Sequence, residues 1–226
     1  MHWWVADYYR ENPMLLGAWV FWVIASITLH ELAHGWTAIK LGDDTPYHTG
    51  HMTFNPLVHM GTTALIMFAL FGFTWGAMPI SPHRLRGRYG EALVAFAGPA
   101  CNMIQFLILI TANILWIKLA SGHVDDNVFL NMHTFLWAGS MINLMGFIFN
   151  LLPIPPLDGW RITADIFPRY NNLWSGERGS IIGLAVFAGM FMFGGSLIWG
   201  IVFFLNQLTL DVACALLGAP DVPAPF

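Results

Sequence analysis

The chain has 226 residues, a mean hydropathy of +0.61, 57% hydrophobic residues and only 10% charged residues. This composition excludes an ordinary soluble domain and is typical of an integral membrane protein. The formal net charge of −4 comes without a basic patch, which argues against a nucleic-acid partner. Because the apolar stretches are long and continuous, we expect an all-α polytopic bundle rather than a β-barrel.

Five apolar stretches are long enough to enter a membrane, at about 14–40, 62–80, 89–119, 128–152 and 180–206. The first follows Pro13, which suits the start of a helix, and it ends at Gly42. About four of the five are predicted to cross the bilayer as full helices. We expect one domain over 1–226, with a core at 14–165 and a C-terminal helix at 180–206.

The segment 45–59 is predicted not to be helical, since Pro46, Gly50 and Pro56 interrupt it. Its central part, 49–55, indicates a short β-strand or hairpin lying at the membrane surface. A basic cluster follows further along the chain and must lie at a water interface; it consists of Arg84, Arg86 and Arg88.

The first apolar stretch contains the sequence His30-Glu31-Leu32-Ala33-His34. On a helix, His30 and His34 are four residues apart and project from one face. Two imidazoles one turn apart can share a tetrahedral zinc ion, and Glu31 beside them can accept the proton of a zinc-bound water. Ionisable residues inside an apolar span are costly, so these three are functional candidates.

A hydrolytic zinc site needs three protein ligands and one open position. Asp158 is the best candidate for the third ligand, because it follows three prolines at the end of an apolar stretch and Gly159 permits a close approach. The alternative is that Asp158 only caps or solvates a helix end. The weaker rivals for the ligand position are His51, His59 and Glu91. Asp165 is expected to be a solvated loop residue.

Three motifs occur in a fixed order along the chain. They are His-Glu-x-x-His at 30–34, Gly-x-x-x-Asn at 98–102, and Asn-x-x-Pro-x-Pro-x-x-Asp-Gly at 150–159. With these motifs the chain resembles the site-2 protease family of intramembrane zinc metalloproteases, and specifically its compact members without a PDZ domain. The resemblance covers roughly residues 14–165.

The resemblance implies a metalloendopeptidase that holds one Zn²⁺ and cleaves a transmembrane helix of a membrane-protein substrate, in regulated intramembrane proteolysis. Glu31 would be the general base, and the zinc ligands would be His30, His34 and Asp158. Asn102 and Asn150 would help to hold the substrate or the oxyanion. For Asn102 the alternative is helix packing, since Gly98 and Asn102 are four residues apart.

The stretch 62–80 is an addition to the three-helix core of the family. The two histidines lie late in the first helix, near the face where that helix ends. If 62–80 crossed the membrane, Asp158 would reach the opposite face, most of a ~30 Å hydrocarbon core away. We therefore predict that 62–80 is re-entrant or lies shallow, which is made possible by Gly72, Gly76 and Pro79.

Under this topology most lysines and arginines fall on the face nearer the site. The positive-inside rule then makes that face cytoplasmic and the N-terminus external, in a multi-pass protein of the cell membrane. The alternative function is a membrane metal transporter, or an inactive relative that binds metal and sequesters partners. Transporters more often have paired repeats with broken helices, which this sequence does not show. The sequence gives no indication of oligomeric state.

Overall fold

The computed structural model describes residues 4–174, 176–220 and 222–225, and all regular secondary structure in these ranges is helical. Four helices are long and apolar enough to cross a membrane: α2 (Pro13–Lys40), α5 (Gly90–Ala120), α6 (Asp126–Asn150) and α10 (Gly195–Leu217). The shorter helices are α1 (Trp4–Glu11), α3 (Thr45–His48), α4 (Pro56–Phe71), η1 (Pro82–Arg84), α7 (Asp158–Ile166), α8 (Pro168–Trp174) and α9 (Gly176–Gly189). The predicted all-α class is confirmed.

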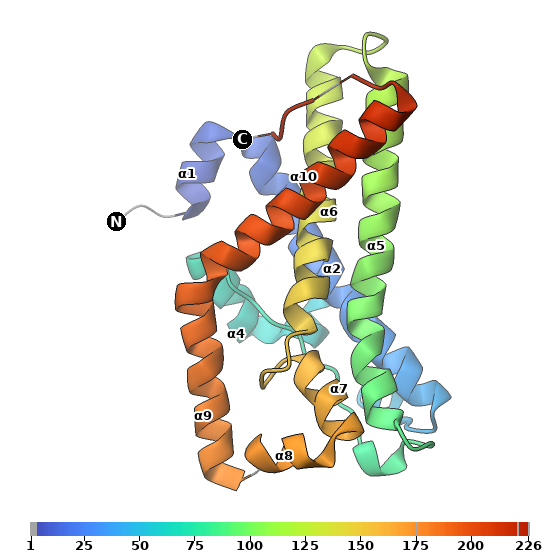
Figure 1. Ribbon diagram of the computed structural model, residues 1–226, viewed down its shortest axis with the longest axis vertical. Helices are drawn as coiled ribbons and strands as arrows, with labels where there is room; N and C mark the ends of the chain where they lie inside the picture. Colours follow the sequence, from blue (N-terminus) through green and yellow to red (C-terminus); the bar gives the residue numbers. More distant parts are fainter. Residues whose placement is uncertain (1–3, 175, 221, 226) are drawn as a thin grey trace.

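The long helices α2, α5 and α6 form the centre of the bundle. α5 and α6 are antiparallel neighbours, and α2 packs against both of them, while α10 crosses α5 and α6 obliquely (Figure 1). The entry into α2 is fixed locally, because the Asn12 side chain accepts a hydrogen bond from the Leu15 amide at 3.0 Å and Pro13 occupies the first turn.

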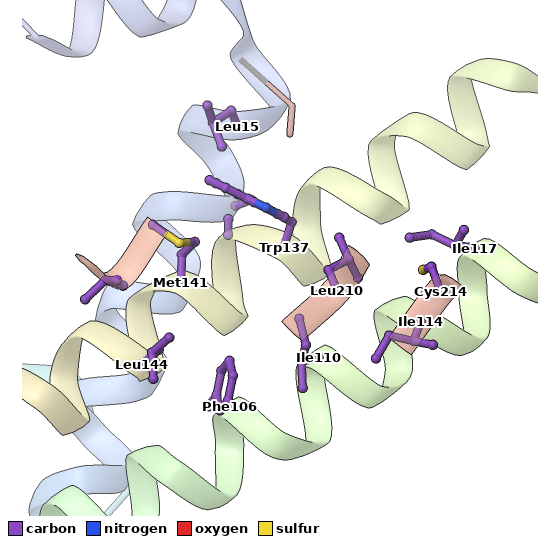
Figure 2. Packing of buried hydrophobic residues seen from close by; sticks show 13 residues of the cluster. Leu15, Phe106, Ile110, Ile114, Ile117, Trp137, Met141, Leu144, Leu210 and Cys214 are labelled. Atoms are coloured by element: carbon purple, nitrogen blue, oxygen red, sulfur yellow. The ribbon is translucent and has the colours of Figure 1, made fainter. Parts of the chain in front are cut away.

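The apolar core lies where α2, α5, α6 and α10 meet (Figure 2). Trp137 of α6 is fully buried at this place, near Leu15 of α2 and Leu210 of α10. Gly139 lets α6 approach α2 closely, since a Cβ there would lie 2.6 Å from the Trp22 ring. Between helices in lipid, such contacts stabilise the bundle through close packing and dispersion.

The predicted β-strand or hairpin at 45–59 is wrong. Thr45–His48 forms α3, and α4 begins at Pro56 with the Asn55 side chain as its cap. No strand occurs in the described parts of the chain. The physical reason is that Pro46 and Pro56 each stand in the first turn of a helix, where the missing N–H of proline costs nothing.

The stretch 62–80 turns back on itself. α4 is kinked at Gly61 (φ 69°), and its straight part at 62–71 is roughly 15 Å long at 1.5 Å per residue, about half of a ~30 Å hydrocarbon core. Gly72 ends it in the left-handed conformation (φ 72°), and the chain then runs back without regular structure. The Ala77 amide donates to the His59 carbonyl at 2.9 Å, so the returning segment reaches the level at which α4 began. A re-entrant segment requires this path.

Beyond Ala77, the returning segment is fastened to the end of α2. The fully buried Asp43 carboxylate accepts the Ser81 amide at 2.6 Å and the Thr45 amide at 3.0 Å. The Arg86 amide donates to the Leu41 carbonyl at 2.8 Å. The chain that leaves α2 near Leu41 thus returns to hydrogen-bond with the same end of α2 at 81–86.

The structure divides the C-terminal stretch that was predicted as one helix at 180–206. α9 ends at Gly189, a π-helical turn covers Met190–Gly194, and α10 continues to Leu217 in a different direction (Figure 1). Glycines at 189, 194 and 195 explain the division. Sharp bends in helices commonly occur at glycines and at π-helical turns.

Candidate metal centre

The structure brings the three predicted metal ligands together. His30 and His34 lie one turn apart on α2, and Asp158 is the first residue of α7. Asp158 Oδ2 is 3.1 Å from His30 Nε2 and 3.3 Å from His34 Nε2, and the two Nε2 atoms are 2.9 Å apart. Among the described residues, this is the one group of three metal-ligating side chains close enough to share an ion.

The rivals for the third ligand position lie outside this group. His59 is buried, but its Nε2 is hydrogen-bonded to the Thr53 carbonyl at 2.7 Å. His51 bonds to Thr49 through Nδ1, and Glu91 is exposed in the first turn of α5. The geometry therefore favours Asp158 over all three.

Both histidine rings are oriented by oxygen atoms that only accept hydrogen bonds. His30 Nδ1 is 2.6 Å from Asn102 Oδ1, and His34 Nδ1 is 2.7 Å from the Val94 carbonyl oxygen. Each ring therefore donates from Nδ1, so that in its neutral form the lone pair is on Nε2. This arrangement is usual for histidines that bind a metal through Nε2.

With both rings neutral, three atoms that carry lone pairs therefore converge. They are the two Nε2 atoms and Asp158 Oδ2, which is buried without a hydrogen-bond donor in the described structure. Around a tetrahedral zinc with bonds of ~2.0–2.1 Å, ligand atoms lie roughly 3.3 Å apart, close to the separations found here. Such atoms repel one another unless a cation joins them, so the donor set fits zinc.

Two glycines create the space for this convergence. A Cβ on Gly98 of α5 would lie 2.5 Å from Nε2 of both His30 and His34, in the region that the ligand lone pairs face. A Cβ on Gly159 would collide with the backbone of Leu151, so glycine lets α7 start close to the end of α6. The predicted close approach at Gly159 is confirmed.

Glu31 lies beside the ligands without belonging to them. It is 7% exposed, and its carboxylate packs against Gly76 of the returning segment, where a Cβ would be 2.6 Å from Glu31 Oε1. The extended chain after α4 therefore passes directly over this carboxylate. A buried carboxylate beside the ligand histidines is suited to accept a proton.

The two predicted substrate asparagines have different surroundings. The Asn102 side chain bonds to His30 through Oδ1 and to Ser26 Oγ and Asn143 Oδ1 through Nδ2, at 2.8 and 3.0 Å. Its amide is thus engaged in holding a ligand. Asn150 donates to a carbonyl one turn earlier in α6 at 3.0 Å. A substrate or oxyanion role stays a prediction for both.

Sequence reasoning missed Ser26 and Asn143. Both are polar residues inside apolar stretches, and Ser26 lies four residues before His30 on the same helical face, so their cost in lipid was the available signal.

The expectation for Asp165 was wrong. Its carboxylate accepts the Ala92 amide at 2.8 Å, which ties α7 to the first turn of α5, where backbone amides lack helical partners.

The chain has relatives among known proteins. YwhC of Bacillus subtilis is 35% identical over 178 residues, which cover 74% of this chain and 78% of that protein. The chain belongs to peptidase family M50. The family model matches residues 112–194, a region that includes the proline-rich loop and Asp158. Family membership makes the chain a metalloprotease, and its four long apolar helices indicate a multi-pass membrane protein.

More distant relatives are also similar over much of the chain. Rip2 of Mycolicibacterium smegmatis is 28% identical over 158 residues, which cover 65% of this chain and 54% of Rip2. Zinc metalloprotease MJ0392 of Methanocaldococcus jannaschii is 26% identical over 182 residues, 77% of this chain and 44% of that protein. The chain thus spans about half the length of these two relatives. No solved structure matches the chain significantly.

Proposed function

We propose that this M50 member is a zinc-dependent intramembrane endopeptidase that cleaves a peptide bond in or near a transmembrane helix of a membrane-protein substrate. The observation that carries the proposal is the convergence of His30, His34 and Asp158 on one point beside the buried Glu31, among apolar helices. Ionisable groups in such surroundings are retained for function.

The chain's own residues divide the work of hydrolysis. Zinc, when bound by His30, His34 and Asp158, would activate water and polarise the scissile carbonyl. Glu31 accepts the proton that the water loses and delivers it to the leaving amine. Because the Glu31 carboxylate is buried and held against Gly76, it meets the reacting atoms from a fixed position.

A transmembrane helix must unwind before its amides are open to attack, since its backbone groups are bonded to one another. The predicted strand at 49–55 cannot receive the unwound segment, because no strand forms there. The extended stretch 74–80 is better placed. It passes Glu31 at Gly76, and within the described structure only its Ala77 amide forms a backbone-to-backbone hydrogen bond. An unwound substrate can pair with this edge by strand addition.

The position of the site supports the proposed topology. His30, His34 and Asp158 lie toward the end of α2 that carries Lys40, and the basic residues of 84–88 lie near the same end through the contact between Arg86 and Leu41. By the positive-inside rule this end is cytoplasmic, which places the N-terminus outside the cell membrane. We propose that residues 1–226 act as one protease domain.

The test is cleavage of a membrane-protein substrate by protein reconstituted in lipid. Glu31→Gln should keep bound zinc and abolish cleavage, because the ligands remain while the proton acceptor is lost. Unchanged cleavage would exclude Glu31 as the base. Zinc flux across the same liposomes that depends on His30 would instead identify a metal transporter.

A further inference from the structure

A chain of buried polar groups crosses three helices and ends on His30. It consists of the Gly139 carbonyl and Asn143 of α6, Ser26 of α2, and Asn102 of α5. Ser26, Asn102 and Asn143 are 4%, 1% and 0% exposed. We infer that Asn143 is a positioning residue that fixes, through Asn102, which ring nitrogen of His30 carries the proton. The inference rests on the ligand role proposed for His30.

The Gly139 carbonyl fixes the donor-to-acceptor direction of this series of hydrogen bonds. A backbone carbonyl only accepts hydrogen bonds, so the Asn143 atom 3.0 Å from the Gly139 oxygen must be the amide nitrogen. The Asn143 oxygen consequently points the other way. It accepts from Ser26 Oγ and from Asn102 Nδ2, both at 3.0 Å.

The same logic passes on to the histidine. Since Asn102 presents its nitrogen to Asn143 and Ser26, it must present its oxygen to His30 Nδ1, which lies 2.6 Å away. His30 therefore donates from Nδ1 and keeps the lone pair of Nε2 for the metal. Every bond in the series has one allowed direction, and the direction is dictated by a helix backbone that cannot rotate.

Loss of the Asn143 acceptor would remove this constraint. The Asn102 amide could then rotate by half a turn and present its nitrogen to His30, which would move the ring proton to Nε2. A protonated Nε2 cannot bind a metal. Supporting partners of metal ligands typically change metal affinity by 10- to 100-fold, so an effect of about that size is expected.

The alternative is that these residues only hold the helices together, as polar groups commonly do in membranes. A pair of variants separates the two. Asn143→Leu keeps the volume and removes the acceptor. Asn143→Asp keeps the direction of the chain, because a carboxyl buried among apolar helices stays neutral. Its hydroxyl can donate to the Gly139 carbonyl while its other oxygen accepts from Asn102.

The readouts are the zinc dissociation constant, measured by competition with a chelator, and the ring-nitrogen chemical shifts of His30 in metal-free protein. Asn143→Leu should bind zinc about 10- to 100-fold more weakly and show mixed protonation of His30. Asn143→Asp should restore both to near their original values. Equal loss in the two variants, or no loss in either, would overturn the inference.

A third variant controls for removal of a buried amide. Asn206 of α10 is fully buried, and neither of its polar atoms has a hydrogen-bond partner in the described structure. Asn206→Leu should leave zinc affinity and His30 protonation unchanged, and a loss like that of Asn143→Leu would refute the positioning role. Neither readout involves proteolysis. A protein that binds zinc but cleaves nothing would contradict the proposed function, and the same two readouts would still support or refute the role of Asn143.

Discussion

Replacing Gly98 by alanine offers a direct test of the metal centre. The added methyl carbon would lie 2.5 Å from Nε2 of both His30 and His34, about 0.9 Å closer than the 3.4 Å at which ordinary contact begins. The neighbours cannot yield cheaply, because both rings are held from behind by Asn102 and Val94. Overpacking of this kind usually costs about 1–3 kcal/mol of stability.

We expect Gly98→Ala to bind zinc at least 10-fold more weakly, which is the loss of affinity typical when the partner that orients a metal ligand is displaced. Cleavage should be lost together with the zinc. The assay is zinc content after dialysis against a weak chelator, together with the thermal midpoint in detergent. Gly17→Ala is the matched control, since it adds a methyl group to α2 where nothing lies within 4 Å. Normal zinc content in Gly98→Ala would refute the arrangement of the two rings described above.

Three further outcomes follow. Asp158→Ala should bind zinc at least 10-fold more weakly by chelator competition, and unchanged stoichiometry would move the third ligand elsewhere. Chelation of wild-type protein should abolish cleavage, with recovery on adding zinc, and activity that survives full chelation would contradict a metal mechanism. Burial raises the pKa of Asp43, but hydrogen bonds from Thr45 and Ser81 lower it more, so its folded pKa lies below the ordinary 3.8. The ionised Asp43 carboxylate therefore stabilises the fold above pH 3.8, and this stabilisation is lost as pH falls through the folded pKa. Over that acid range, the thermal midpoint of Asp43→Asn should fall less steeply than that of the wild type.

The features that depend on local pattern were predictable from the sequence. His30 and His34 share a helical face because they are four residues apart, and the proline-rich approach to Asp158 indicated a carboxylate at a break in an apolar stretch. Parity of membrane crossings then required 62–80 to turn back, which agrees with the observed contact between Ala77 and His59.

Other features depend on information that no short stretch contains. Pro46 and Pro56 are compatible with a helix start as well as with a break, so their sequence did not distinguish α3 and α4 from a hairpin. Asn143 meets Asn102 and Ser26 only through the relative rotation of α2, α5 and α6. Such a register between helices is a tertiary property, and sequence spacing alone does not specify it.

The ligands of the metal centre come from two distant parts of the chain, α2 and the first residue of α7. A bound ion would therefore cross-link α2 to the start of α7, just after the proline-rich loop. By mass action, an ion that binds only the folded protein adds to its stability in proportion to the logarithm of ion concentration. Supply of zinc in the cell would then govern how long the protein survives as well as how fast it works.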